Sequence, residues 1–159
     1  MARWVSRFQT RRPTATPSSA ARPPHQAETT TMNTTPATTD NDTTIKQFLD
    51  LFALKDATKL APYFDQDIVF ENYGSPQIKG RDAVVGLWAG VFSAMERVEF
   101  TTLHQAVDGD IVIAEQLHGL ALPGRPLAPI KNMAIYRLRD GRIVEWRDYT
   151  NSEYARTLM

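Results

Sequence analysis

The chain of 159 residues contains no cysteine, which excludes disulfides, thiolate zinc sites and a cysteine nucleophile. It also lacks an excess of charge, because 18 lysines and arginines balance 18 aspartates and glutamates. A neutral chain gives no general reason to expect nucleic-acid or membrane binding. Its most apolar stretch, residues 83–95, is well short of the about 20 residues that span a bilayer. We therefore expect a soluble protein without a nucleic-acid or membrane partner.

Several motifs of known chemistry are missing as well. The three histidines, His25, His104 and His118, do not have the close spacing of a metal site. The chain has no glycine-rich phosphate loop and no serine nucleophile in a strand-to-helix turn. The sequence therefore predicts neither a metal ion nor a cofactor, and the enzyme class that remains is cofactor-free chemistry.

Residues 1–42 differ in composition from the rest of the chain. They hold five of the ten prolines, many threonines and few aliphatic residues, so we expect a disordered N-terminal tail. The first 27 residues carry five arginines and no acidic residue, which is typical of an organelle transit peptide. The alternative, which we favour, is an upstream extension ahead of Met32. Since no hydrophobic secretion signal is present, the expected location is the cytoplasm.

Residues 43–159 show the patterns of one folded domain. Apolar residues such as Phe48 and Phe52 recur at helical spacing, and a second stripe of this kind includes Trp88. Pro62 limits the length of a helix between these two. The expected helices are 43–55, 57–64 and 80–95.

The remainder of this domain reads as strands separated by turns. Asp108-Gly109 and Asp140-Gly141 are typical of tight hairpins, because Asp and Gly tolerate positive backbone angles. The expected strands are 68–73, 97–107, 111–122, 130–139 and 142–149. This order predicts an α+β fold in which three helices pack on one face of a curved antiparallel sheet.

Four polar residues fall on the expected inward faces of the strands. Asp148 shares a face with Trp146, Asn72 follows an apolar strand, and Gln116 and His118 interrupt an otherwise apolar row. An apolar pocket disfavours the charged form of a carboxylate, which makes Asp148 a usable acid or base near neutral pH. We expect His118 and Asp148 to form an acid/base dyad, with Asn72 and Gln116 holding a water or a substrate oxygen.

Each of these residues also has a structural alternative. His118 could be a hydrogen-bonded core histidine, and Asp148 could form a buried salt bridge, with His118 as a candidate partner. His104 shares the face of the strand 97–107 that holds Val98, so it is either a further pocket residue or a structural histidine.

Apolar residues complete the expected pocket and an expected interface. The predicted pocket wall consists of Phe70, Trp88, Trp146 and Leu120. Outward-facing side chains of the sheet favour a homodimer; they are Ile143, Tyr149 and Leu117.

Four short motifs carry a resemblance to a known family. They are Phe70-Glu71-Asn72, residues 79–84 (Lys-Gly-Arg-Asp-Ala-Val), residues 140–143 (Asp-Gly-Arg-Ile) and residues 146–149 (Trp-Arg-Asp-Tyr). Together they resemble the SnoaL-like branch of the nuclear transport factor 2-like superfamily, which includes limonene-1,2-epoxide hydrolase. The resemblance covers residues 43–149 and implies a cone-shaped sheet that encloses, with three helices, a deep and mostly apolar pocket.

The resemblance also assigns roles, and the chain departs from some of them. Asn72 and Asp148 match the epoxide-hydrolase pattern, whereas Phe70, Gln116 and His118 stand where that pattern has Tyr, Arg and Asp. Without the Arg, no cation keeps two neighbouring carboxylates ionised, so the same epoxide-opening relay is not expected. The His-plus-Asp pair is more similar to polyketide cyclases of the SnoaL type, which abstract a proton next to a carbonyl.

The sequence thus leads to two hypotheses about function. The first is a cofactor-independent acid/base enzyme that acts on a small apolar oxygenated molecule, as an isomerase of the ketosteroid type, a cyclase or an epoxide hydrolase. The second is a noncatalytic small-molecule-binding or accessory domain. The state of Asp148 discriminates between them, because a base needs an accessible carboxylate whereas a structural aspartate is fully paired.

Overall fold

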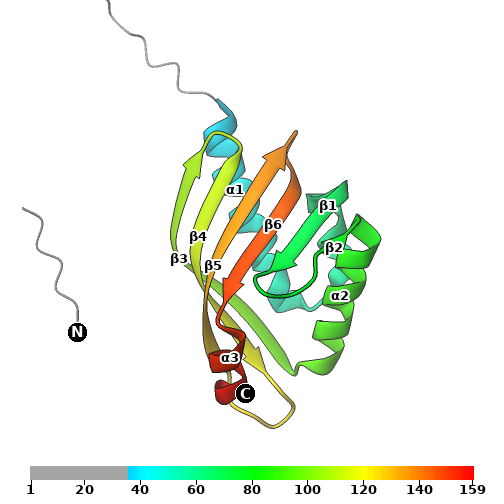
Figure 1. The fold of residues 1–159 in the computed structure, drawn as a ribbon, viewed down its shortest axis with the longest axis vertical. Coiled ribbons are helices and arrows are strands. Elements are labelled where there is room, and N and C mark those ends of the chain that lie inside the picture. The colour runs from blue at the N-terminus through cyan, green and yellow to red at the C-terminus, as the bar shows by residue number, and fades with distance from the viewer. Residues whose placement is uncertain (1–35) are drawn as a thin grey trace, which may run out of the picture. The chain divides into compact units, whose positions relative to one another are not determined.

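The computed structural model describes residues 36–159 (Figure 1). The expectations of a disordered tail, a transit peptide or an upstream extension fall mainly on residues 1–35, which lie outside the described residues. In chain order the elements are α1 (Pro36–Asp50), the short 3-10 helices η1 (Leu51–Leu54), η2 (Ala57–Lys59) and η3 (Ala61–Tyr63), β1 (Phe64–Asn72), β2 (Ile78–Lys79), α2 (Arg81–Ala94), β3 (Arg97–Asp108), β4 (Ile111–Ala121), β5 (Ala128–Arg139), β6 (Arg142–Thr150) and α3 (Ser152–Leu158).

The first helices differ from the expected ones at their ends. α1 begins at Pro36, ahead of the expected start at residue 43, and proline suits the first turn of a helix. The chain leaves the helical path at Lys55, which adopts a left-handed conformation with φ of 52°. The expected helix 57–64 is instead the two 3-10 turns η2 and η3, because Pro62 cannot continue an α-helix.

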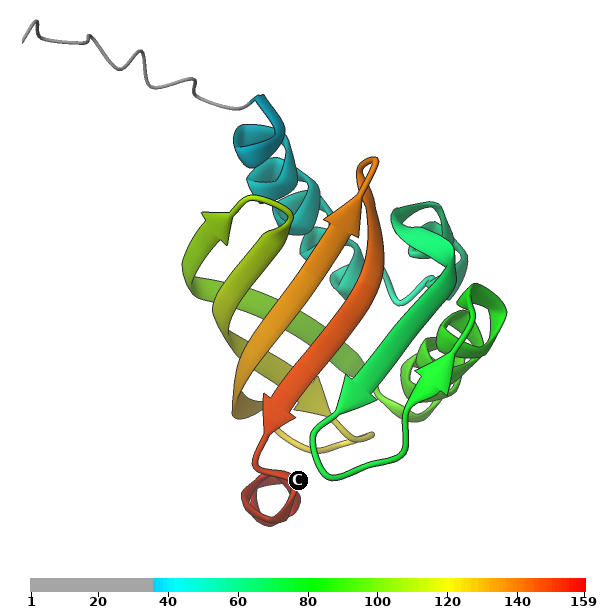
Figure 2. The same cartoon turned by 45° about the horizontal axis from the view of Figure 1, so that its top comes forward.

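The six strands form one curved sheet in the order β2-β1-β6-β5-β4-β3 (Figure 2). This confirms the α+β fold with a curved sheet. The sheet is not wholly antiparallel, however, because β1 and β6 run parallel and place Asn72 opposite Asp148. No hairpin joins these two strands, so their direction is free of the constraint that makes hairpin neighbours antiparallel. The parallel pair brings the ends of β1 and β6 to the same place.

The two predicted hairpin turns are confirmed. Gly109 joins β3 to β4 with φ of 59°, and Asp140 and Gly141 join β5 to β6 with φ of 52° and 71°. Two successive positive φ angles match the right-handed twist of the paired strands.

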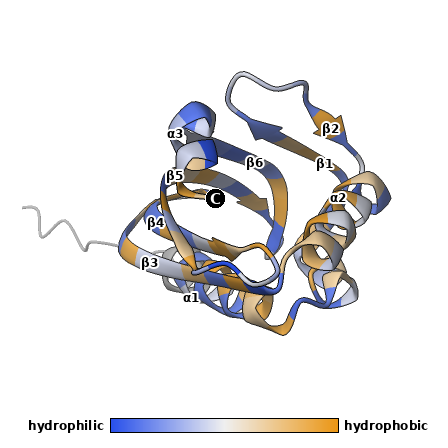
Figure 3. Cartoon of the chain, turned by 90° about the horizontal axis from the view of Figure 1, so that it is seen from below, coloured by the Kyte–Doolittle hydropathy of each residue, from blue (hydrophilic) through white to orange (hydrophobic). Residues whose placement is uncertain are grey.

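The core lies on the concave face of the sheet, under α1 and α2. Trp146 of β6 is fully buried at its centre and stacks on Trp88 of α2 with ring centroids 5.4 Å apart. The ring of Phe48 in α1 contacts the indole of Trp146 edge-on, with ring centroids 5.5 Å apart. The ring centroid of Phe70 in β1 lies 4.7 Å from that of Trp146. Seen from below, α2 and α3 flank the opening of the curved sheet on opposite sides (Figure 3).

Two irregularities change which side chains face the core. The β5–β6 register skips Val144, so Ile143 points inward and is fully buried instead of lying on the expected outer face. The β3–β4 register likewise skips Leu103. His104 therefore lies opposite Glu115 on the outer face, with its side chain 83% exposed, and is not a pocket residue.

The C-terminal helix α3 follows β6 directly and was not expected from the sequence. Asn151 caps it, because its side-chain oxygen accepts a hydrogen bond from the backbone N–H of Tyr154 at 2.9 Å. Across residues 36–159, no helix combines the length and the apolar character needed to cross a membrane.

Candidate functional site

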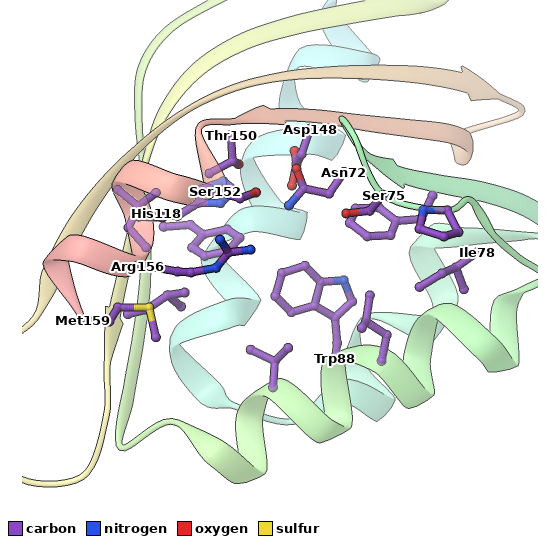
Figure 4. A pocket seen from close by; sticks show the side chains of 18 residues that line it. Asn72, Ser75, Ile78, Trp88, His118, Asp148, Thr150, Ser152, Arg156 and Met159 are labelled. Atoms are coloured by element: carbon purple, nitrogen blue, oxygen red, sulfur yellow. The ribbon is translucent and has the colours of Figure 1, made fainter.

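A cavity of about 430 Å³ opens between α2, α3 and the ends of β1 and β6 (Figure 4). Most of its wall is apolar, with Phe70, Trp88, Phe100 and Leu120 among the lining side chains. The polar side chains lie mainly on one side, where β1, β6 and α3 meet. A ligand with an apolar body and one polar end would therefore match the distribution of side chains in the cavity.

The structure brings three of the four predicted polar residues to this cavity. Asn72, His118 and Asp148 line it, and the carboxylate of Asp148 and the amide of Asn72 lie side by side (Figure 4). Gln116 is fully buried behind the wall, so it cannot hold a substrate oxygen as expected. Of the predicted wall residues, Trp146 also lies behind the surface of the cavity.

The two carboxylate oxygens of Asp148 have different surroundings. Oδ1 accepts hydrogen bonds from Nδ2 of Asn132 at 2.9 Å and from Nε1 of Trp146 at 2.8 Å. Oδ2 accepts no hydrogen bond from any residue that the structure describes. Because Asp148 is only 3% exposed yet lines the cavity, Oδ2 is the oxygen that a ligand would meet.

Burial controls the proton affinity of this carboxyl group. Removal from water disfavours the carboxylate and raises the pKa of Asp148 to about 7, although the hydrogen bonds from Asn132 and Trp146 oppose the shift. No cation forms an ion pair with Asp148 among the described residues. Both protonation states are therefore populated near neutral pH, as an acid/base catalyst requires.

His118 does not form the expected direct dyad with Asp148. Its Nε2 lies 2.8 Å from Oε1 of Gln116 and 3.2 Å from Nδ2 of Asn132, and the same Asn132 nitrogen bonds Asp148. Asn132 thus stands between the two groups. The imidazole also stacks on Phe100, with ring centroids 3.7 Å apart, so packing fixes its orientation.

His118 is neutral in this setting. Burial lowers its pKa to about 3, and no acidic group among the described residues stabilises the imidazolium. Gln116 donates from Nε2 to the hydroxyl of Tyr136 at 3.1 Å, which turns its Oε1 toward His118. The network assigns the ring proton to Nε2, which donates to Gln116, and leaves Nδ1 as an acceptor.

Two polar groups at the cavity wall lack protein partners. Oδ1 of Asn72 and Nε1 of Trp88 are buried without a hydrogen bond from the described residues. Nδ2 of Asn72 also has no acceptor within that part of the chain. Since an unmet buried polar group costs about 1–3 kcal/mol, the asparagine is positioned to bind a polar atom of a ligand.

Asn132 belongs to the polar network around Asp148 but is not among the residues predicted from the sequence. It is buried, holds Asp148, and is itself oriented by Thr150, whose hydroxyl donates to Oδ1 of Asn132 at 2.8 Å. A signal was present, because Asn132 interrupts an inward row of β5 that otherwise contains apolar residues and Tyr136. Arg156 of α3 was missed for a different reason, since no helix was expected there.

The acidic and histidine side chains do not gather into a metal site. Within residues 36–159, no group of three or more His, Asp or Glu side chains is placed to hold a metal ion. Among the described residues that line the cavity, Asp148 is the acidic side chain whose pKa lies near neutrality.

Comparison with known proteins identifies a family and a fold. The family model described as a SnoaL-like domain matches residues 45–146. An LEH-like epoxide hydrolase of M. tuberculosis is 25% identical, with a TM-score of 0.66 over 77% of this chain and 90% of that chain. An isomerase of Bacillus subtilis, provisionally assigned, is 24% identical, with a TM-score of 0.66 over 76% of this chain and 92% of that chain. A provisionally assigned SnoaL-like polyketide cyclase of Jannaschia sp. CCS1 is 18% identical, with a TM-score of 0.66 over 77% and 93%.

Proposed function

This chain belongs to the family of SnoaL-like domains, with the nuclear transport factor 2-like fold, and from that premise we propose that it is a cofactor-independent acid/base enzyme. Its substrate would be a small apolar molecule with a carbonyl or similar oxygen. The observation that carries this proposal is the buried Asp148, whose Oδ1 is fixed by two donors while Oδ2 is left for a ligand.

Asp148 would transfer the proton. As a carboxylate, Oδ2 removes a proton from a substrate carbon next to a carbonyl, and as a carboxylic acid it returns that proton to another atom. Because the pKa of Asp148 is raised to about 7, the carboxylate and the carboxylic acid can both take part in one catalytic cycle at neutral pH. Asn132 and Trp146 would keep the carboxylate in one orientation throughout.

Asn72 would bind the substrate oxygen. Its register position opposite Asp148 puts an amide donor beside the proton-transferring oxygen. A hydrogen bond to a carbonyl strengthens as that oxygen gains negative charge during proton removal, which stabilises the transition state. Neutral His118 would not act as a second base, because its Nε2 proton is donated to Gln116 and burial keeps its pKa low.

Proton transfer next to a carbonyl, as in an isomerase or a cyclase, is favoured over water activation. Phe70 lines the cavity without a hydroxyl group that could hold a water, and Gln116 does not reach the cavity. The epoxide-hydrolase arrangement would need a second charged group near Asp148, and no such group pairs with it among the described residues. Epoxide hydrolysis is included as an alternative reaction in the turnover test below.

The test measures turnover of a β,γ-unsaturated steroid ketone, an aromatic polyketide aldehyde and a terpene epoxide by the full chain. Asp148→Asn is expected to lower kcat at least 100-fold, because general acid/base catalysis contributes about 10²–10⁴-fold. The matched control is Asp67→Asn, which neutralises an exposed carboxylate on β1 and should leave kcat unchanged.

Three outcomes are distinct. Loss of turnover in Asp148→Asn alone supports the proposal and names the substrate class. Turnover that survives this substitution contradicts it. Binding of these compounds without turnover by the wild type would favour a noncatalytic binding domain instead.

A further inference from the structure

The C-terminal helix presents one face to the cavity. Ser152, Ala155, Arg156 and Met159 follow the three- and four-residue spacing of one helix face, and all four line the cavity. Figure 4 shows the guanidinium of Arg156 reaching inward, toward the space above Trp88. α3 therefore forms part of the cavity wall.

Packing against β5 fixes the position of α3. Ala155 is buried against Ala128 and Ile130 of β5, with Leu158 and Met159 packed beside them. The side chain of Asn151 caps the first turn of the helix. Because Arg156 directly follows the buried Ala155, the direction of its side chain is set by a docked helix.

No ion pair joins Arg156 to an acidic side chain within the part of the chain that the structure describes. Four other arginines, Arg97, Arg137, Arg139 and Arg147, each form an ion pair with an acidic side chain, whereas Arg156, like Arg81, Arg125 and Arg142, forms none with the described residues. Arg156 alone among these unpaired arginines lines the cavity. The one acidic side chain among the described residues that line the cavity, Asp148, is bonded to Asn132 and Trp146. Arg156 is an exposed residue, so the cavity combines an apolar wall with one solvent-accessible cation among its lining side chains.

We propose that the cavity selects apolar ligands that carry a carboxylate, which Arg156 binds together with the hydroxyl of Ser152. This inference deepens the proposed function and rests on it for the identity of the reacting site. The carboxylate lies against α3, the apolar body extends along Trp88 and Phe100, and the reacting atoms reach Asp148 and Asn72. A guanidinium suits this role, because its planar donors match a carboxylate in geometry.

The test compares matched acids and alcohols by isothermal titration calorimetry on the full chain. The probes are geranate and naphthalene-2-carboxylate, with geraniol and 2-naphthylmethanol as their neutral counterparts. At about pH 6 the free acids are ionised, since carboxyl groups titrate near 4. Burial raises the pKa of Asp148 to about 7, so Asp148 carries little charge at that pH.

We expect at least one acid to bind the wild type about fivefold more tightly than its alcohol. Arg156→Gln removes this preference and leaves alcohol binding unchanged. Arg125→Gln, which removes the same charge from an exposed position outside the cavity lining, retains the preference.

The opposing outcomes are separate from those of the turnover test. Equal binding of acid and alcohol, no binding of either acid, or a preference that survives Arg156→Gln overturns the proposal. Asp148→Asn is expected to keep the acid preference even where it abolishes turnover. A preference for acids, found together with no turnover of any compound in the turnover test, would refute the enzymatic function and leave the ligand class standing.

Discussion

Asp148 and His118 give the stability of the protein two opposing pH dependences. Folding raises the pKa of Asp148 from 3.8 to about 7, so between these values the folded state binds a proton that the unfolded state lacks. The stability contributed by Asp148 is thus complete below about pH 4 and is lost as the pH rises toward 7. Folding lowers the pKa of His118 from 6.5 to about 3, so its contribution is present above 6.5 and is lost as the pH falls toward 3.

Substitution of either residue should remove its own contribution to the pH dependence of stability. The free energy of unfolding of Asp148→Asn, relative to wild type, should increase by up to about 1.4 kcal/mol per pH unit between pH 4 and 7. For His118→Gln the relative free energy should fall with pH between about 3 and 6.5. Urea unfolding at four pH values measures both slopes, and parallel curves for all three proteins would contradict these protonation states.

Asn132 should set the pH at which activity appears. Its hydrogen bond lowers the pKa of Asp148, so Asn132→Leu should raise that pKa and move the midpoint of the rise in kcat/KM to higher pH. Lys131→Leu alters the neighbouring outward residue of β5 and should leave the midpoint in place. An unchanged midpoint in Asn132→Leu would mean that Asp148 is not the titrating base.

At the residue scale, alternation along the strands correctly indicated which of the polar side chains lie on the inward face. Asn72, His118 and Asp148 line the cavity because no bulge separates them from their nearest inward apolar neighbours, such as Phe70 and Trp146. Alternation does not show how far an inward side chain lies from the cavity surface. For this reason the sequence places Gln116 in the cavity, whereas in the structure it bonds Tyr136 behind the cavity wall. Contacts across strands, such as Asn132 with Asp148, need the strand register that only the folded sheet supplies.

At the element scale, the sequence predicted most strands and α2, and failed where the chain departs from regular geometry. Single-residue bulges at Leu103 and Val144 reverse the faces of His104 and Ile143, and a bulge leaves no periodic signal. The helix α3 is short and its stability depends on docking against β5, so local spacing predicts it poorly. The parallel direction of β1 and β6 is likewise a long-range property.

The close approach of β3, β4 and the connection to β5 depends on Gly119. A β-carbon there would lie 2.9 Å from Cδ2 of Leu127 and 3.0 Å from the backbone oxygen of Glu99. Gly119→Ala should therefore destabilise the protein by about 1–3 kcal/mol. Gly90→Ala, in the exposed part of α2 with open space around it, should stabilise by up to about 1 kcal/mol. Thermal unfolding of both variants checks the contrast, and equal melting temperatures would refute it.

At the scale of the whole molecule, the outer face of the sheet is suited to a second copy. Ile113, Met133 and Tyr149 expose 40%, 42% and 41% of their surface there. Glu115 and Lys131 flank them with opposite charges, so the face is complementary to itself under twofold symmetry. We propose that the protein is a homodimer through this face.

The homodimer can be tested by sedimentation velocity. Met133→Lys should give a monomer, because it buries a charge at the centre of the interface. Leu54→Lys introduces the same charge at an exposed apolar residue outside the sheet and should leave the dimer intact. A wild-type monomer, or a dimer that persists in Met133→Lys, would exclude this interface.

The parallel pairing of β1 with β6 has a consequence for how the protein is made. Synthesis runs from the N-terminus, so β1 leaves the ribosome long before the strand that covers its open edge. Until β6 arrives, Phe70 lacks its contact with Trp146, and the backbone edge of β1 that pairs with β6 has no partner strand. The cavity is thus among the last features to be completed, and a chain that stops before Arg142 would leave an unpaired strand edge of the kind that favours aggregation.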